Sequence, residues 1–278
     1  MTGASRGIGL VAAEHIRRET RLVAVTRGPG EVSADLGSLE SIRSAAAGIR
    51  DRLDRGELPP LRGFVGNAGI QHINAWTESA DGFEATFAIN VLANYLFIRL
   101  LADRFVTPAR IVITVSDTHF GDFRHNLGMV PGPVWKSPQM VALPGAFANP
   151  GSVAAGRTAY STSKLAAIYL VHECARRLPG IDVVAYNPAF VPGTGLGRNA
   201  SGVARFALRR ILPLLTVPPF ATSRRAAGRF LADVVLGRTA APTGSYVDRG
   251  RVVRSSAESY DPEREAELWA AAERFTAC

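Results

Sequence analysis

The segment Thr2-Gly3-Ala4-Ser5-Arg6-Gly7-Ile8-Gly9 carries the strongest indication of the fold. Its three glycines permit a tight turn and let a pyrophosphate approach the N-terminus of the helix that follows. Gly9–Arg18 has a helical pattern, and Leu22–Thr26 is a β-branched apolar segment. A glycine turn that opens a helix and leads into a strand is typical of a dinucleotide-binding βαβ unit.

The rest of the chain alternates strand-like and helix-like segments. The predicted strands are Gly63–Val65, Ile111–Val115 and Asp182–Tyr186, and the predicted helices are Leu39–Leu53, Gly82–Phe105 and Tyr160–Leu178. Short apolar strands without alternation, separated by helices, predict a parallel sheet covered on both faces. We therefore expect an α/β fold with a Rossmann-type doubly wound parallel sheet.

The strand that should precede the glycine turn is absent from the sequence. In a βαβ unit this strand lies in the middle of the sheet, yet only Met1 precedes Thr2. We expect the first strand to be truncated and favour a translation start upstream of Met1. Completion of the sheet by an upstream or tag segment, and a defective sheet, are the alternatives.

No linker divides the chain, so we predict a single dinucleotide-binding domain over residues 1–278 with two irregular segments. The inserted loop 117–158 is rich in Gly and Pro and predicts a partly ordered lid. Its aromatic residues are Phe120, Phe123, Trp135 and Phe147. Residues 193 to about 222 are predicted to form a substrate lid. Its amphipathic part, Val203–Leu215, either packs on the core or makes weak contact with a membrane surface.

The composition narrows the class of protein. The net charge is +8, but the arginines are spread along helical segments, so we predict no nucleic-acid partner. No apolar run reaches the ~20 residues that a membrane-spanning helix needs. Cys174 and Cys278 are the two cysteines. They form neither a disulfide framework nor a metal site, which favours a cytoplasmic location and no bound metal.

Tyr160-Ser161-Thr162-Ser163-Lys164 places a phenol and an ammonium group four residues apart, on one face of a helix. Lysine is rare in this chain and occurs elsewhere only at Lys136. A nearby positive charge favours the phenolate, so we expect a lowered pKa for Tyr160. A tyrosine of this kind can exchange a proton with a substrate near neutral pH.

Two arginines indicate which dinucleotide is bound. Arg27 ends the second predicted strand, where NAD-binding proteins place an acidic residue for the ribose 2′-hydroxyl. Arg6 lies inside the glycine turn. Two cations at the adenosine end of the cofactor favour a 2′-phosphate, and the predicted cofactor is NADP(H).

These motifs together resemble the short-chain dehydrogenase/reductase superfamily over nearly the whole chain. The matching features, in order, are Thr2–Gly9, Asn67-Ala68-Gly69, Asn90, Ser116 and Tyr160-x-x-x-Lys164. The resemblance implies that Tyr160 is the general acid and that Lys164 lowers the pKa of Tyr160 and holds the nicotinamide ribose. It also implies that Ser116 binds the substrate oxygen and that Asn90 holds a water in a proton relay.

The resemblance also implies the residues that contact the cofactor. Asp35 and Leu36 are similar to a pair that contacts the adenine ring, and the loop from Asn187-Pro188 to Thr194 is similar to one that holds the carboxamide. The predicted cofactor-binding residues are Gly3, Ser5, Arg6, Gly7, Ile8, Gly9, Arg27, Asp35, Leu36, Asn67, Ala68, Gly69, Asn90, Tyr160, Lys164, Pro188 and Thr194.

Three positions depart from the family pattern. Gly66 stands where many members have a second asparagine, and Ala189 stands where a glycine usually follows the proline. Asp117 follows the catalytic serine, where a small residue is common. Asp117 either places a carboxylate near the site or faces solvent.

Ser116 and Tyr160 are 44 positions apart, and the insert between them is similar to that of retinol dehydrogenase-like and protochlorophyllide reductase-like members. Ser116-Asp117-Thr118-His119 resembles the latter group in particular. Both groups act on large apolar molecules. His119 is either a second proton donor or a structural residue, and neither cysteine can be matched to the pocket cysteine of the pigment-reducing members.

The leading functional hypothesis is an NADPH-dependent oxidoreductase that reduces a ketone or aldehyde on a bulky apolar substrate, or oxidises the alcohol. Tyr160 would be its general acid/base. A reductase of a conjugated carbon–carbon double bond is the second hypothesis. A non-catalytic NADP-binding protein is the third. The sequence leaves open whether the protein is a monomer or a homodimer.

Overall fold

The computed structural model describes residues 1–28, 30–126, 128–192 and 221–277. The predicted lid falls almost entirely outside these residues, together with Val203–Leu215 and the predicted cofactor ligand Thr194. The second cysteine, Cys278, also lies outside them.

The protein has an α/β fold built on a mostly parallel sheet, as the sequence predicts. Strands β3, β4, β5, β6 and β7 lie side by side in that order, and β1 pairs with β2. All pairs are parallel except β6 with β7. The strands are β1 (Val25–Thr26), β2 (Val32–Ser33), β3 (Leu61–Gly66), β4 (Phe105–Thr114), β5 (Ile181–Asn187), β6 (Tyr246–Asp248) and β7 (Arg251–Val253).

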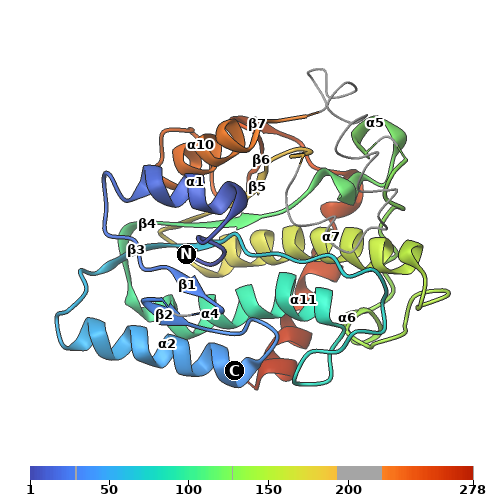
Figure 1. Ribbon diagram of the computed structural model, residues 1–278, viewed down its shortest axis with the longest axis horizontal. Coiled ribbons are helices and arrows are strands. Elements are labelled where there is room, and N and C mark those ends of the chain that lie inside the picture. Colours follow the sequence, from blue (N-terminus) through green and yellow to red (C-terminus); the bar gives the residue numbers. More distant parts are fainter. Residues whose placement is uncertain (29, 127, 193–220, 278) are drawn as a thin grey trace.

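The N-terminal residues lie between β1 and β3, where a βαβ unit has its first strand (Figure 1). Thr2 forms parallel bridges with both Val25 and Gly66. The Thr2 amide donates to the Val65 carbonyl at 2.9 Å, and the Val25 amide donates to the Met1 carbonyl at 2.9 Å. The pairing at this position therefore involves two residues, and the glycine turn follows it directly.

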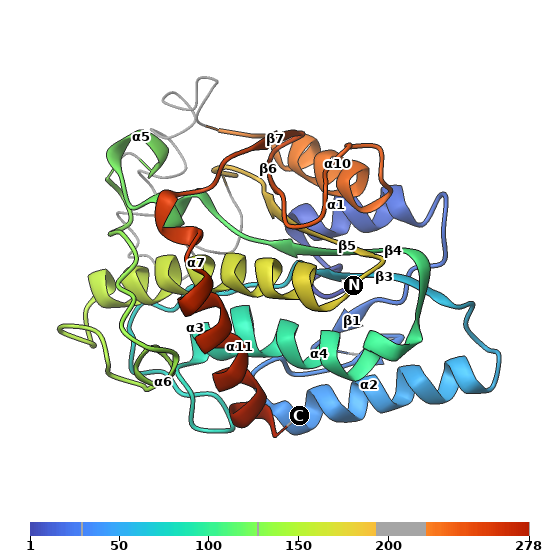
Figure 2. The same cartoon turned by 180° about the vertical axis from the view of Figure 1, so that it is seen from behind.

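Helices cover both faces of the sheet (Figures 1 and 2). Helices α1 (Gly7–Ile16) and α10 (Arg224–Val235) pack on one face, and α2 (Leu39–Asp54), α4 (Ala93–Leu101) and α7 (Val153–Arg177) lie on the other. Successive residues of a strand point to opposite faces. Accordingly, Ile111 and Ile113 join the core beneath α4 and α7, whereas Val112 joins the core beneath α1 and α10.

The predicted helix Gly82–Phe105 is interrupted. It consists of α3 (Ala85–Phe87), the π-helical turn η1 (Ala88–Leu92), α4 and the 3-10 turn η2 (Ala102–Arg104). The sequence predicts no apolar run long enough to span a membrane. In the structure, however, the span Ala85–Arg104 has the length and composition of such a helix, with a mean hydropathy of 1.5. Because 78% of its most apolar window is buried inside the protein, it is a core helix.

The insert after Ser116 contains short helices, which are η3 (Asp117–Phe120), α5 (Phe123–Asn126) and α6 (Pro138–Val141). Helix α7 begins at Val153, so the expected start at Tyr160 is wrong. The Ser152 hydroxyl accepts the Ala155 amide and caps the helix there. The insert is partly ordered by its aromatic residues: Phe147 is buried, and Trp135 packs edge-on against Tyr169.

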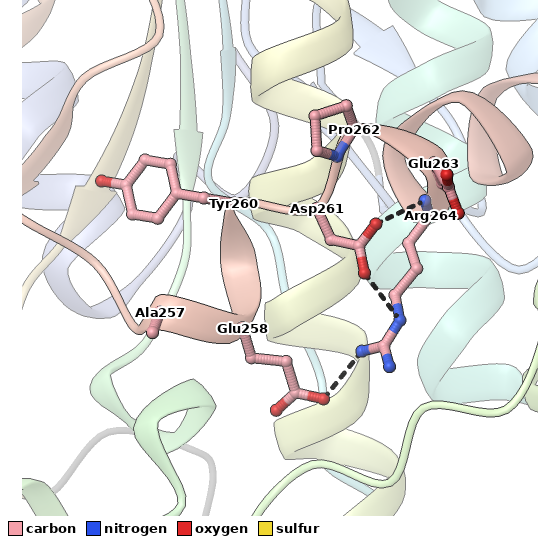
Figure 3. Close-up of a pocket in the computed structure, with 7 residues that line it drawn as sticks. All are labelled: Ala257, Glu258, Tyr260, Asp261, Pro262, Glu263 and Arg264. Atoms are coloured by element: carbon pink, nitrogen blue, oxygen red, sulfur yellow. Dashed lines mark hydrogen bonds and ion pairs between the residues drawn. The ribbon is translucent and has the colours of Figure 1, made fainter.

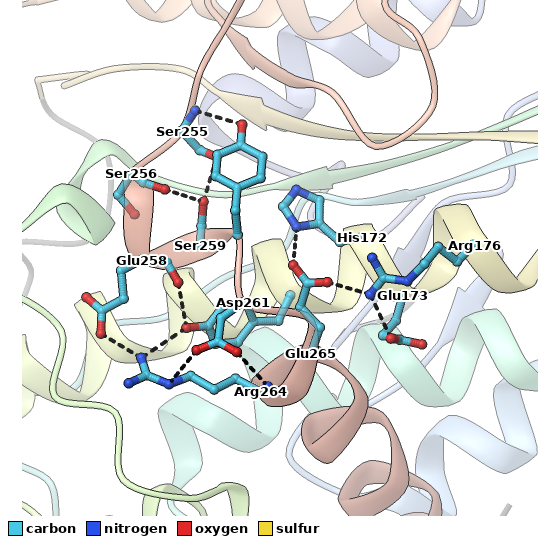
Figure 4. A network of polar contacts seen from close by, with 12 residues as sticks. His172, Glu173, Arg176, Ser255, Ser256, Glu258, Ser259, Asp261, Arg264 and Glu265 are labelled. Atoms are coloured by element: carbon cyan, nitrogen blue, oxygen red, sulfur yellow. Dashed lines mark hydrogen bonds and ion pairs between the residues drawn. The ribbon is translucent and has the colours of Figure 1, made fainter.

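The C-terminal helix α11 (Pro262–Thr276) docks on α7 through a network of charged groups (Figure 4). The Glu265 carboxylate is 2% exposed and lies 2.6 Å from His172 Nδ1. Arg176 bonds to Glu265 and, at 2.7 Å, to Glu173. A buried carboxylate with several charged or polar partners is stable only in one geometry, so this network sets where α11 sits.

Candidate active site

The predicted site residues gather at the edge of the sheet where the parallel strands end. Asn67 follows β3, Ser116 lies two residues after β4, and Pro188 follows β5. The glycine turn begins after Thr2 at the same edge. Ligands of open α/β sheets bind at the carboxyl ends of the strands, so this is the candidate active site.

The glycine turn has the geometry that a dinucleotide requires. Gly3 and Gly7 have φ values of +67° and +61°, which other residues adopt rarely. A Cβ on Gly9 would lie 2.0 Å from the Gly3 carbonyl oxygen. The Arg6 side chain does not cap the N-terminus of α1, so the first amides of the helix remain available for a phosphate.

Asn67 joins the glycine turn to the sheet. Its Nδ2 donates to the Gly3 carbonyl at 3.2 Å, and its Oδ1 accepts the Thr114 hydroxyl at 3.3 Å. The adjacent Ala68 amide donates to Thr2 Oγ1 at 3.1 Å. These contacts give Asn67 and Ala68 a supporting position beneath the predicted cofactor.

The adenosine end of the predicted site carries a free cation. Arg27 directly follows β1 and is exposed, and no acidic side chain within the described ranges pairs with it. Asp35 and Leu36 follow β2 at the same edge, and the Asp35 carboxylate accepts the Gly37 amide at 3.0 Å. Arg27, Asp35 and Leu36 therefore lie at the edge of the sheet where the adenosine of a dinucleotide is expected.

Tyr160 and Lys164 are buried on α7 with only 5% and 4% of their surfaces exposed. Lys164 Nζ lies 5.6 Å from the centre of the Tyr160 ring and donates to the Thr114 carbonyl at 2.9 Å. Burial raises the pKa of Tyr160 above its usual value and lowers the pKa of Lys164 to about 8. The expected lowering of the Tyr160 pKa is thus wrong for this structure, because desolvation outweighs the hydrogen bond from Ser116 and the charge of Asp117 adds to the rise.

Asn90 lies in the π-helical turn η1, next to the tyrosine–lysine pair. Its Oδ1 accepts the Ile70 amide at 2.9 Å, and its Nδ2 donates to the Ile70 carbonyl at 3.0 Å and to Ser163 Oγ at 2.9 Å. A Cβ on Gly69 would lie 3.3 Å from both Asn90 Oδ1 and Lys164 Nζ. Asn90 and Lys164 therefore flank the same glycine, and Gly69 leaves room for them. The π-turn is a common feature of functional sites.

Ser116 lies beside Tyr160, and a hydrogen bond between their side chains partly offsets the effect of burial on the Tyr160 pKa. His119 supports Ser116 from behind. Its Nδ1 lies 2.6 Å from the Ser116 carbonyl, and its Nε2 accepts the Ser256 amide at 3.1 Å. Since Nε2 accepts, Nδ1 carries the hydrogen and donates it. Both ring nitrogens are occupied, and burial lowers the pKa of His119 to about 4, so the structural interpretation of His119 is confirmed.

Two departures from the family pattern have a physical explanation. A Cβ on Gly66 would lie 2.2 Å from Asn94 Oδ1, so the buried Asn94 side chain takes the space that a larger residue at 66 would need. Asn94 Nδ2 also donates to the Asn90 carbonyl at 2.8 Å. Ala189 has a φ of +58°, the left-handed conformation that favours glycine.

Cys174 lies outside the candidate site. It is fully buried on α7, and burial raises its pKa above the usual thiol value. It stands 14 residues beyond Tyr160, which is ~21 Å along a helix. Cys174 is therefore a core residue and does not face the tyrosine.

A hollow among the described residues is separate from the site. It has a volume of about 630 Å³ and is lined by Ala257, Glu258, Tyr260, Asp261, Pro262, Glu263 and Arg264 (Figure 3). The Arg264 guanidinium is paired with Asp261 and Glu258. Tyr169 contacts this segment through its hydroxyl and lies nine residues beyond Tyr160, or ~13 Å along α7.

Three polar residues that shape the site were not predicted from the sequence. Thr114 provides the carbonyl that binds Lys164, Ser163 binds Asn90, and Asn94 occupies the space beside Gly66. Asn94 carried a readable signal, since it is four residues after Asn90 inside an otherwise apolar helix. The other two act through contacts between distant segments, which no local pattern reveals.

No family model matches the chain, but many known proteins are similar to it. The protein provisionally named daunorubicin C-13 ketoreductase DnrU from Streptomyces sp. (strain C5) is 31% identical, over 98% of this chain and 89% of that protein. Human retinol dehydrogenase 13 is 28% identical over 99% of this chain and 83% of its own length. Protochlorophyllide reductase B from Oryza sativa is 27% identical over 99% and 76%.

Solved structures show the same fold. The NADPH-bound carbonyl reductase from chicken fatty liver superposes with a TM-score of 0.58 at 18% identity, covering 91% of this chain and 96% of that chain. The 3α-hydroxysteroid dehydrogenase from Pseudomonas sp. B-0831, complexed with NADH, has a TM-score of 0.62 at 22% identity, covering 90% and 94%. The two structures hold different nucleotides on this fold.

Proposed function

Because the chain belongs to the short-chain dehydrogenase/reductase superfamily of oxidoreductases, we propose that it is an NADPH-dependent reductase of ketones or aldehydes on bulky apolar molecules. One observation carries the proposal: Tyr160 is buried beside Ser116, at the end of the sheet that also presents the glycine turn. A proton donor at the carboxyl ends of parallel strands is placed to act on a substrate held against a nucleotide.

The raised pKa of Tyr160 favours the direction of reduction. The phenol keeps its proton at neutral pH and can give it to the carbonyl oxygen as that oxygen becomes negative. A bound nicotinamide supplies the hydride to the carbonyl carbon. Ser116 positions the oxygen by a hydrogen bond, and the ammonium of Lys164, four residues from Tyr160, stabilises the phenolate after proton transfer.

NADPH is proposed as the cofactor because of Arg27. Its exposed guanidinium is free to bind a 2′-phosphate in a bidentate manner. The residues that would hold the rest of the nucleotide are Gly3, Gly7 and Gly9 at the pyrophosphate, Asp35 and Leu36 at the adenine, and Lys164 at the ribose.

The bulky apolar substrate is proposed from the insert and the relatives. The 117–158 segment brings aromatic residues to the region after Ser116, and apolar walls are typical of such pockets. Retinol, the substrate in the name of retinol dehydrogenase 13, is a large apolar alcohol, and the name of DnrU specifies the C-13 ketone of a large molecule. This comparison supports the class of substrate.

Replacement of Tyr160 by Phe tests the mechanism. Reduction of bulky ketones should fall by about 10²–10⁴-fold, because general acid catalysis is lost. NADPH affinity, measured by tryptophan quenching, should be unchanged. Tyr169→Phe is the matched control, since its hydroxyl on the same helix bonds to the Glu258 carbonyl and lies away from the site. Normal turnover by Tyr160→Phe would contradict the mechanism.

Replacement of Arg27 by Asp tests the cofactor. The dissociation constant of NADPH should rise by roughly tenfold or more, since at least one charge-assisted hydrogen bond is lost, and that of NADH should change little. Arg18→Asp makes the same change in net charge at the far end of α1 and should leave both constants alone. Equal effects on NADPH and NADH would refute the assignment.

Reduction of a conjugated carbon–carbon double bond is the second candidate, because the chain is similar to a protochlorophyllide reductase along nearly its entire length. It uses the same hydride but needs a proton at carbon. The buried position of Cys174 argues against that residue as the proton donor. Product analysis with deuterated NADPH separates the two reactions, because the deuterium is found on a carbinol carbon in one and on a saturated carbon in the other.

A further inference from the structure

Asp117 is a residue of the site region to which no role has been given. It follows Ser116 at the start of η3 and is only partly exposed. The Ser116 hydroxyl donates to Asp117 Oδ1, with the two oxygens 3.3 Å apart. The carboxylate therefore faces the serine and does not simply point to solvent.

The contact limits what Ser116 can do. A serine hydroxyl has one hydrogen to donate. The Asp117 carboxylate and the Tyr160 oxygen are both within reach of it, and the charged carboxylate is the stronger acceptor. The oxygen of the same hydroxyl accepts the Thr118 amide at 3.3 Å. While Asp117 is a carboxylate, it thus competes with a substrate carbonyl for the Ser116 hydrogen.

We propose that Asp117 is a positioning residue for ketone reduction: its carboxylate holds the Ser116 hydrogen, and its neutral acid form releases that hydrogen to the substrate oxygen. This inference rests on the proposed function, because it assigns Ser116 to the substrate oxygen. The proton that neutralises Asp117 comes from solvent and takes no part in the transfer from Tyr160.

The surroundings of Asp117 make both forms accessible near neutral pH. Burial raises its pKa to about 6, and the negative charge of Asp248 on β6 acts in the same direction. The hydrogen bond from Ser116 and the nearby His125 on α5 oppose the shift. Arg249 pairs with Asp248 at 2.7 Å and so weakens its repulsion.

Two tyrosines face Asp117 from the other packed elements. They are Tyr160 on α7 and Tyr246 on β6, and the charge of Asp117 raises the pKa of both. An ionised Asp117 therefore keeps Tyr160 protonated while it withholds the Ser116 hydrogen. Protonation of Asp117 gives the site two donors for one carbonyl oxygen, since Tyr160 keeps its proton in either case.

The pH profile of ketone reduction at saturating NADPH tests the proposal. Wild-type kcat/KM should fall as the pH rises through about 6, because Asp117 ionises and removes one donor. Asp117→Asn has no charge to gain and should lack this fall. At pH 8 it should be faster than wild type by about tenfold. This is less than the ~10²–10³-fold that outright loss of such a donor costs, because the amide oxygen of asparagine remains a weaker acceptor for the Ser116 hydrogen. The same fall in Asp117→Asn as in wild type would overturn the proposal.

A titration that needs no turnover tests the contact itself. The aspartate carboxyl groups are labelled with ¹³C and followed by NMR. One carboxyl should titrate near pH 6 in the wild type and be missing in Asp117→Asn. Its midpoint should rise in Ser116→Ala, which loses the donor, and fall in Asp248→Asn, which loses the repulsion. An unchanged midpoint in Ser116→Ala would show that Ser116 does not bond to Asp117.

The two experiments separate this inference from the proposed function. A wild-type protein that reduces ketones with a flat profile between pH 5 and 8 would refute the role of Asp117 alone. A wild-type protein that reduces no bulky ketone at any pH would refute the proposed function. In that case the proposal for Asp117 falls with it, although the titration would still decide whether the Ser116 contact exists.

Discussion

Replacement of Lys164 by Met should change how the stability of the protein depends on pH. Lys164 is 4% exposed, and burial lowers its pKa from 10.5 to about 8. At about 1.4 kcal/mol per pKa unit, burying the ammonium costs about 3 kcal/mol of folding free energy at neutral pH. Methionine has a similar length, carries no charge and does not incur this cost.

The sign follows from proton linkage. Between pH 8 and 10.5 the unfolded chain binds more protons at Lys164 than the folded chain, so the free energy of unfolding rises with pH. The cost is present in full below pH 8 and disappears above 10.5. From pH 7 to pH 10, wild type should therefore gain about 2 kcal/mol relative to Lys164→Met.

This difference is insensitive to the other consequences of the substitution. Lys164→Met also removes the 2.9 Å hydrogen bond to the Thr114 carbonyl. At pH values below 8, the loss of this bond changes the difference in unfolding free energy between the two proteins by a constant amount. Other titrating groups contribute equally to both proteins and cancel. Urea unfolding of wild type and variant at several pH values between 7 and 10 measures the effect. A difference in stability that does not vary with pH would show that Lys164 titrates normally and refute the reasoning.

Two predictions concern backbone positions. Gly9→Ala should weaken NADPH binding by about tenfold or more, because its Cβ would collide with the Gly3 carbonyl. The control is Gly48→Ala, at an exposed position in the middle of α2. It should leave binding intact and raise the melting temperature by about 2 °C. Equal NADPH affinities for the two variants would contradict the assigned turn. Ala189→Gly should raise the free energy of unfolding by about 0.5–1 kcal/mol, because φ is +58° at this position, and a destabilised variant in urea unfolding would show that no strain is stored there.

Local patterns in the sequence were sufficient for the fold class and for most of the site residues. The spacing of apolar residues along the strands and helices reflects which side chains are buried in or against the sheet. The structure confirms the predicted parallel sheet. Gly3, Gly7 and Gly9 predict the turn. Gly3 and Gly7 have positive φ values, and the backbone at Gly9 leaves no space for a side chain. Tyr160 and Lys164 are readable as a pair because four residues make one helical turn.

The pKa values and hydrogen-bond partners of the site residues could not be predicted from local sequence patterns, because they depend on the surroundings of each side chain in the folded protein. The spacing of Tyr160 and Lys164 predicts a lowered phenol pKa, but the folded protein buries both groups and desolvation reverses the shift of Tyr160. The roles of His119 and Asp117 were equally open. Each depends on partners that lie far apart in the sequence or on exposure after folding, such as the Ser256 amide at the His119 ring.

The sequence by itself thus determined which elements form and which chemical groups reach the carboxyl edge of the sheet, since these depend on residue type and short-range spacing. Only the tertiary structure established the state of those groups. It buries Lys164 against the Thr114 carbonyl and fixes the His119 tautomer, and it turns the Ser116 hydrogen toward Asp117. The physical reason is that solvation and hydrogen-bond partners are properties of the packed chain. The pKa shift caused by desolvation on burial can therefore exceed the shift caused by a neighbouring charge.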